Sequence, residues 1–162
     1  MTAPESKRPI PGSFAWPVRV YYEDTDAAGV VFYANYLNFM ERARTEWLRA
    51  LGFEQTTLLH DYNVVFVVRS LAVEYLRPAL FNDELEVTVS LTGTRGSLLE
   101  IAQTVRRGTH NLVTGNVKVA CVNTQSFKPV RIPRTIKSAG DLMDHSSATD
   151  SSWKSESISV RP

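Results

Sequence analysis

The stretch VRVYYEDTDAAGVVFYANYLNFMERARTEWLRALG, Val18–Gly52, decides the fold of this chain. Residues 18–22 are mostly β-branched or aromatic, which predicts a strand. From 36 to 51 the apolar residues recur with the period of an α-helix, and Gly52 stands where a helix commonly ends. Arg44 is the one charge on the apolar face, so we expect it to extend to solvent or to meet an acid of a second subunit. The apolar face consists of Tyr36, Met40, Ala43, Trp47 and Leu51.

Three carboxylates, those of Glu23, Asp24 and Asp26, crowd the segment between the strand and the helix. Unpaired carboxylates do not fit a buried strand, so this segment predicts a turn, with Gly29 as its hinge. A helix start supplies free N–H donors and partial positive charge, which polarise a carbonyl group. A carboxylate beside it can attack that carbonyl or activate water, so the turn is a candidate catalytic region.

Composition predicts one globular domain that needs no disulfide bond or structural metal ion. The chain has 162 residues, of which 43% are apolar, and its net charge of +1 gives no reason to expect nucleic acid or a membrane surface as partner. We find no signal peptide and no apolar run long enough to cross a membrane, and we expect a cytoplasmic protein. The single cysteine, Cys121, excludes an intramolecular disulfide and lies in an alternating apolar stretch, where we expect it to be buried.

The remaining segments predict one antiparallel sheet. We expect a flexible lead-in over 1–16, a domain over 17–137 and a disordered tail over 138–162. A connector over 54–63 is expected to hold one further helical turn. The fold class predicted is α+β, with a five-stranded antiparallel sheet wrapped around one long central helix. After the helix, strands are expected at Val64–Leu76, Glu84–Thr92, Ser97–Arg106 and Leu112–Asn123.

Several familiar catalytic motifs are missing from the sequence. It contains no G-x-S-x-G, P-loop, H-E-x-x-H or G-x-G-x-x-G, so serine hydrolase, nucleoside triphosphatase and zinc protease functions have no support. The acidic turn does not fit a calcium loop, because valine and phenylalanine follow where oxygen ligands are needed. The three histidines lie in polar or turn-like segments, and we expect solvated side chains there. No metal site is expected.

The sequence Y-Y-E-D-T-D-A-A-G-V-V-F-Y-A-N-Y-L at 21–37, followed by F-M-E-R-A-R-T-E at 39–46, closely resembles the signature of the hotdog-fold thioesterases of the 4-hydroxybenzoyl-CoA thioesterase type. Within them it looks most like the bacterial acyl-CoA thioesterases associated with the Tol–Pal system, the YbgC group. The resemblance continues in V-E-Y-L-R-P-A-x-x-x-D-E-L at 73–85 and K-P-V-R-I-P at 128–133.

This resemblance implies roles for residues of the acidic turn. Asp26 matches the catalytic aspartate of the family, acting as nucleophile or as general base. Tyr33 matches the position whose backbone N–H faces the thioester carbonyl, so we expect the helix to begin near Phe32. Gly29 and Val30, which lie between them, are implied to contact the substrate.

The resemblance also implies a binding region for the coenzyme A phosphates. Arg95 and Ser97 belong to one matching segment, 94–97, and Lys128 and Arg131 to another, 128–131. Basic side chains suit phosphates because they donate charge-assisted hydrogen bonds. Coenzyme A is part of the substrate, so no cofactor is implied.

Three functions remain open at this point. The first is an acyl-CoA thioesterase that acts on acyl-CoA or on an acyl carrier protein thioester, as a homodimer or tetramer whose sheets join edge to edge. The second is a hydroxyacyl thioester dehydratase of the same fold, which needs a histidine that the acidic turn lacks. The third is a non-catalytic scaffold that binds acyl carriers.

Overall fold

The computed structural model describes residues 14–134 and residue 136. The expected tail over 138–162, and residues 1–13 of the expected lead-in, lie outside the described residues. In chain order the elements are strand β1 (Phe14–Arg19), 3-10 helix η1 (Tyr22–Asp24), helices α1 (Asn35–Ala50) and α2 (Gln55–Asp61), and strands β2 (Val64–Tyr75), β3 (Glu84–Arg95), β4 (Leu98–Arg107) and β5 (His110–Asn123).

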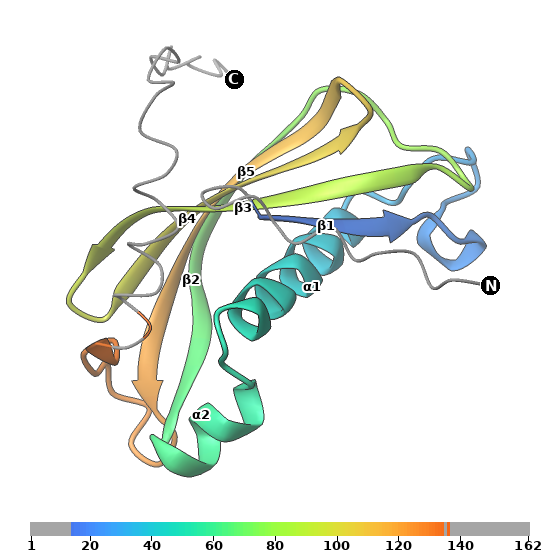
Figure 1. Ribbon diagram of the computed structural model, residues 1–162. Helices are drawn as coiled ribbons and strands as arrows, with labels where there is room; N and C mark the ends of the chain where they lie inside the picture. The colour runs from blue at the N-terminus through green and yellow to red at the C-terminus, as the bar shows by residue number, and fades with distance from the viewer. Residues whose placement is uncertain (1–13, 135, 137–162) are drawn as a thin grey trace, which may run out of the picture.

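One sheet holds all five strands in the order β1-β3-β4-β5-β2, and each neighbouring pair is antiparallel. The sheet curves around α1, which runs across its inner face (Figure 1). The predicted α+β architecture, a five-stranded antiparallel sheet around one long helix, is therefore confirmed. The connector between α1 and β2 contains α2, as expected. No helix in the described ranges is both long and apolar enough to cross a membrane.

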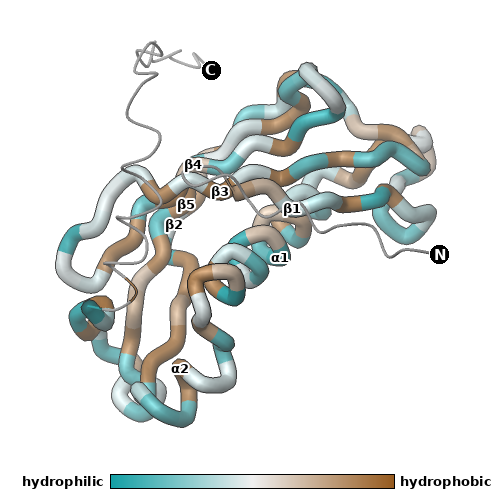
Figure 2. The backbone as a smooth tube through the Cα atoms, in the orientation of Figure 1, coloured by the Kyte–Doolittle hydropathy of each residue, from teal (hydrophilic) through white to brown (hydrophobic). Residues whose placement is uncertain are grey.

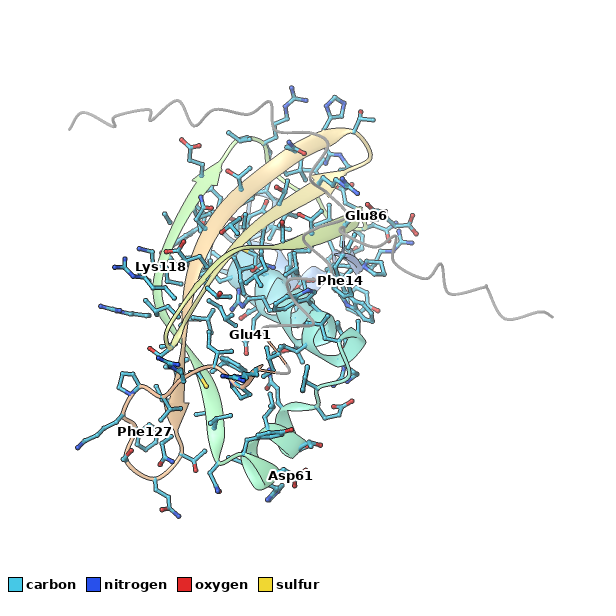
Figure 3. All side chains as sticks on the ribbon, turned by 60° about the vertical axis from the view of Figure 1, so that its left-hand side comes forward. Phe14, Glu41, Asp61, Glu86, Lys118 and Phe127 are labelled. Carbon is cyan, nitrogen blue, oxygen red and sulfur yellow. The ribbon has the colours of Figure 1, made fainter. Side chains whose placement is uncertain are left out.

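The core lies between α1 and the inner face of the sheet. Figure 2 shows how apolar and polar residues alternate along the strands, which is the pattern of a sheet with one face buried. In Figure 3, Lys118 points away from α1 on the outer side of the sheet. Each fully buried large side chain contributes about 1.5–3 kcal/mol relative to its exposed state. The buried face of α1 consists of Tyr36, Phe39, Met40, Ala43, Trp47 and Leu48.

Gly115 allows α1 to approach β5 closely. A Cβ atom at this position would lie 3.0 Å from Cε and 3.2 Å from Sδ of Met40, closer than ordinary van der Waals contact. Met40 is a fully buried residue of α1, and its side chain would have to shift to admit that Cβ atom. The missing side chain of Gly115 is therefore a packing requirement of this part of the core.

Arg44 meets an amide inside its own chain. Its guanidinium donates a hydrogen bond of 2.8 Å to Oε1 of the buried Gln103, whose Nε2 donates one of 3.0 Å to the carbonyl of Met40. Burial lowers the pKa of Arg44 from its ordinary value, and the charge of Glu41 offsets part of this effect. Within its own chain, Arg44 is therefore bound by a neutral acceptor, and this contact also joins α1 to β4.

Two predicted boundaries were wrong. The first strand covers 14–19 rather than 18–22, so residues 14–16 of the expected lead-in belong to the sheet. Pairing with β3 ends at Arg19, and η1 follows because the chain turns there. The central helix begins at Asn35 rather than near Phe32. The N–H of Phe32 donates instead to the carbonyl of Asp24, which holds the chain outside the helical path.

The buried carboxylate of Asp24 fastens the acidic turn to the helix. One oxygen accepts a hydrogen bond of 2.8 Å from the N–H of Tyr21, and the other accepts one of 2.6 Å from Nδ2 of Asn35. Both carboxylate oxygens of Asp24 thus accept hydrogen bonds, in agreement with a structural role. These two bonds join the start of η1 to the start of α1 and so fix the position of the segment between them.

We predict that Gly115→Val lowers the free energy of unfolding by about 1–3 kcal/mol, because the new methyl groups overlap the Met40 side chain. Urea denaturation followed by circular dichroism measures this change. Asn116→Val, at the exposed next position of the same strand, should change the midpoint little. Equal midpoints for the two variants would contradict the packing argument.

We predict that Asp24→Ala lowers the free energy of unfolding by about 1–3 kcal/mol, because it leaves the N–H of Tyr21 and the amide of Asn35 without their charged acceptor. Thermal and urea unfolding provide the measurement. Glu23→Ala is the matched control, since this neighbouring side chain is exposed. If both variants unfold like wild type, Asp24 is not the anchor of the turn.

Candidate active site

Asp26 lies on a tight loop between two bridged positions. Thr25 pairs with Val31, the N–H of Asp26 donates to the carbonyl of Val30 at 2.9 Å, and the N–H of Gly29 donates to the carbonyl of Asp26 at 3.0 Å. Gly29 has φ of +75°, a conformation that glycine adopts without strain. This loop holds the exposed Asp26 side chain in place.

One of the two carboxylate oxygens of Asp26 accepts a hydrogen bond. Its Oδ1 accepts a hydrogen bond of 2.8 Å from the N–H of Ala28, which fixes the orientation of the group. Among the described residues, no donor is recorded for its other oxygen. An exposed, oriented carboxylate with one free oxygen is able to accept a proton or to attack a carbonyl carbon.

A second turn, residues 32–34, joins this loop to α1. The N–H of Asn35 donates to the carbonyl of Phe32 at 2.8 Å, and Ala34 is the N-cap residue, with no side-chain cap. Within the described ranges, neither the N–H of Tyr33 nor that of Ala34 has a recorded acceptor. Tyr33 therefore lies just outside α1, and its N–H is free for a ligand.

Tyr75 was not predicted to take part in this region. Its hydroxyl donates a hydrogen bond of 2.8 Å to the carbonyl of Tyr33, across 42 positions of sequence. Its ring meets those of Tyr33 and Tyr36 edge to face, with centroids 6.5 and 5.7 Å apart. Tyr75 belongs to the V-E-Y-L-R-P motif, which marks this segment as similar to the family. Nothing in that motif indicated a role for its side chain.

The four residues expected at the coenzyme A phosphates lie together at another place. Arg95 and Ser97 flank the turn between β3 and β4, where the carbonyl of Gly96 accepts a hydrogen bond of 3.2 Å from the N–H of Ile132. This contact brings the turn beside the segment that carries Lys128 and Arg131. The two basic segments therefore meet, as a shared phosphate site requires.

Within one chain the two groups of residues are far apart. In Figure 1 the loop after β1 lies on the right, whereas α2 and the segment after β5 lie at the lower left. Figure 3 shows Phe127 and Asp61 together at that second end, well away from Phe14. The structure therefore brings Asp26, Gly29, Val30 and Tyr33 together, but places the phosphate residues at the opposite end of the subunit.

A cleft of about 410 Å³ lies at the basic end. Its walls include the apolar side chains of Val64 and Val130, the ring of Tyr62, and the guanidinium groups of Arg131 and Arg134. Arg131 is one of the expected binding residues, and Arg134 adds a second positive charge that the sequence did not single out. The cleft is therefore lined by both basic and apolar residues.

Cys121 takes no part in either region. Its side chain is fully buried, as predicted, and burial raises the pKa of its thiol to about 11. A thiol with this pKa stays protonated near neutral pH and is a poor nucleophile. His60 and His110 are exposed on α2 and at the start of β5, and neither lies on the loop of Asp26.

Comparison with known proteins identifies relatives of this chain. The sequence profile described as thioesterase superfamily matches residues 28–114, which includes Tyr33 and begins two residues after Asp26. The acyl-CoA thioesterase YbgC of Haemophilus influenzae is 46% identical over 130 residues, covering 80% of this chain and 96% of that protein. The acyl-CoA thioester hydrolase YbgC of Escherichia coli O6:H1 is also 46% identical, over 76% of this chain and 92% of its own length.

A solved structure supports the same relationship. The probable thioesterase of Bartonella henselae superimposes with a TM-score of 0.72 at 35% identity, covering 75% of this chain and 99% of the other. The resemblance drawn from the sequence motifs is thereby confirmed. By its fold, its sequence and its relatives, the chain belongs to the thioesterase superfamily.

Proposed function

We propose that this thioester hydrolase cleaves acyl-CoA to a free acid and coenzyme A, with Asp26 as the catalytic carboxylate. The observation that carries the proposal is the pairing of a half-engaged carboxylate with a turn of free N–H groups, at Tyr33 and Ala34, on one short loop. Relatives named as acyl-CoA thioesterases support the choice of substrate.

The reaction follows from this arrangement. The free oxygen of Asp26 takes a proton from a water molecule while the water oxygen attacks the thioester carbon. Negative charge then develops on the carbonyl oxygen, and the N–H of Tyr33 donates to it. When the tetrahedral intermediate collapses, the carbon–sulfur bond breaks and the coenzyme A thiolate leaves and is protonated.

The alternative route that we propose is direct attack of Asp26 on the carbonyl carbon. That route forms an acyl–aspartyl anhydride, which water then hydrolyses to regenerate the carboxylate. A single turnover in H₂¹⁸O detects one form of this route. Mass spectrometry finds ¹⁸O in Asp26 only if an anhydride is hydrolysed at the aspartyl carbon, whereas hydrolysis at the acyl carbon and the general-base route both label only the acid product.

We further propose a homodimer in which two copies of β2 pair antiparallel. The other edge strand, β1, has only six residues and carries Pro17, which blocks pairing at an edge. β2 has twelve residues and leaves Val67, Val68 and Leu71 exposed by 38–52%. A long apolar edge of this kind favours a partner strand.

This pairing would complete the site. In an antiparallel pair around a two-fold axis, the start of one β2 lies beside the end of the other. Val64, which lines the basic cleft, would then approach Tyr75 of the second copy, whose hydroxyl holds the Tyr33 turn. Arg131 and Lys128 of one copy would thus serve the Asp26 of the other. A tetramer would require a further contact between dimers.

The two alternative functions have less support. A dehydratase needs a histidine beside the acid, and the described loop around Asp26 contains none. A scaffold that only binds acyl carriers gives no reason for free N–H groups beside an oriented carboxylate. We also propose a cytoplasmic location and a link to the Tol–Pal cell-envelope system, both on the strength of the resemblance to the YbgC group.

We predict that Asp26→Asn reduces kcat for acyl-CoA hydrolysis by at least about 100-fold, because the amide neither accepts the proton nor attacks the carbonyl. Release of coenzyme A is measured with a thiol reagent on substrates of graded acyl length and on acyl carrier protein thioesters. Glu23→Gln is the matched control and should keep wild-type rates. Equal, negligible rates for wild type and Asp26→Asn would refute the thioesterase proposal.

We predict that Val68→Lys combined with Leu71→Lys converts the dimer to monomers and reduces activity at least about tenfold, because like charges at the paired edge repel and the composite site comes apart. Sedimentation velocity measures the assembly state. Thr109→Lys combined with Asn111→Lys adds the same charge at an exposed hairpin and should leave both properties unchanged. A wild-type protein that is monomeric and fully active would contradict the composite site.

A further inference from the structure

We propose that Tyr75 is a positioning residue for the reaction, and that its hydroxyl sets the oxyanion donor by holding the carbonyl of Tyr33. This inference rests on the proposed thioesterase function. The direct observation is the hydrogen bond of 2.8 Å from the Tyr75 hydroxyl to that carbonyl.

In the part of the chain that the structure describes, the backbone of Tyr33 makes no tertiary hydrogen bond other than the one with Tyr75. Phe32 is tied on both sides, because its N–H donates to the carbonyl of Asp24 and its carbonyl accepts from Asn35. The carbonyl of Ala34 accepts from the N–H of Leu37. Tyr33 lies between these anchors, and within the described part of the chain its one recorded backbone hydrogen bond is the one from Tyr75.

The aromatic rings keep the hydroxyl in place. The Tyr75 ring stands edge to face against the rings of Tyr33 and Tyr36, with interplanar angles of 78° and 62°. Tyr36 is itself fixed, since its hydroxyl accepts a hydrogen bond of 2.9 Å from the N–H of Ala79. Three rings from the turn, α1 and β2 therefore hold the donor over the Tyr33 carbonyl.

The chemical state of the hydroxyl suits this role. Burial raises the pKa of Tyr75 above its ordinary value, and the neighbouring Tyr33 raises it further. The group therefore keeps its proton throughout the neutral range, in which a thioesterase would be assayed. Its proton is donated to the Tyr33 carbonyl in a hydrogen bond, so the hydroxyl does not act as an acid or base toward the substrate.

The carbonyl of Tyr33 shares its peptide plane with the N–H of Ala34, so the hydrogen bond from Tyr75 fixes the direction of the Ala34 N–H, the second free donor of the turn. The N–H of Tyr33 belongs to the preceding peptide plane, whose Phe32 carbonyl accepts from Asn35. Negative charge develops on the thioester oxygen as the tetrahedral intermediate forms, so the benefit of a well-aimed donor appears in the transition state rather than in substrate binding. Because Tyr75 ends β2, the same hydrogen bond also links the proposed dimer edge to the oxyanion turn.

The test is the steady-state kinetics of Tyr75→Phe, which keeps the ring and removes only the hydroxyl. We expect kcat to fall about threefold to tenfold, the loss of one hydrogen bond, with KM within about twofold of wild type. Affinity for a thioether analogue of acyl-CoA, which has no carbonyl oxygen, should be unchanged. Tyr22→Phe, at an exposed residue of η1, is the matched control and should behave like wild type.

The outcomes separate this inference from the proposed function. If wild type is active, Asp26→Asn is inactive and Tyr75→Phe has wild-type kcat, the thioesterase function stands and the role of Tyr75 is refuted. A raised KM with unchanged kcat would also refute it, because the hydroxyl would then serve substrate binding. Melting temperature and sedimentation velocity, measured on the same samples, show whether a lower kcat comes from unfolding or dissociation; either would overturn the inference. If wild type and Asp26→Asn are equally inactive, both proposals fail.

Discussion

The carboxylate of Asp24 is the constraint on which the site depends. It is buried, and it joins the N–H of Tyr21 to the amide of Asn35, so the segment between η1 and α1 is closed at both of its ends. Asp26 sits inside this closed segment and owes its position to it. Two acids two residues apart thus have opposite tasks, because one is enclosed by donors while the other keeps an oxygen exposed. The buried one fixes the geometry of the segment, and the exposed one is the acid to which we assign the proposed chemistry.

The sheet determines how the two ends of the subunit can work together. Curvature around α1 carries the acidic loop to one end and the basic segments to the other (Figure 1). The edge strands differ in a way that favours one solution. β1 is short and carries Pro17, whereas β2 is long and apolar at its edge. Antiparallel pairing at β2 would bring the acidic loop of one copy beside the basic segments of the other. The proposed active site therefore depends on the proposed dimer.

Much of this fold follows from periodicity. On the buried face of α1, Phe39 and Leu48 were missed and Leu51 is only partly buried. The strands after α1, to within about three residues at their ends, and the other buried residues of α1 were predicted correctly, because alternation and the helical period reflect burial on one side, a property that each segment carries by itself. The start of α1 was not, since it depends on a hydrogen bond between Phe32 and Asp24 that local propensity does not encode. The first strand was misplaced for a similar reason: Tyr21 and Tyr22 have strand-forming side chains, but the Asp24 carboxylate draws the backbone into a turn. At the site, Asp26 and Tyr33 came from a motif, whereas the contact of Tyr75 with Tyr33 joins positions 42 apart and appears only in three dimensions.

The start of α1 shows a cost that the proposed function explains. Ala34 occupies the N-cap position, where serine, threonine, aspartate or asparagine would stabilise the helix by about 1 kcal/mol. The one nearby side chain that suits a cap, Asn35, is instead committed to Asp24. An oxygen at position 34 would compete with a substrate for the N–H groups at the helix start, and a carboxylate there would repel the negative charge that develops on a thioester oxygen. Alanine leaves those donors free, so a helix start without a side-chain cap stands where a ligand oxygen is expected to complete it.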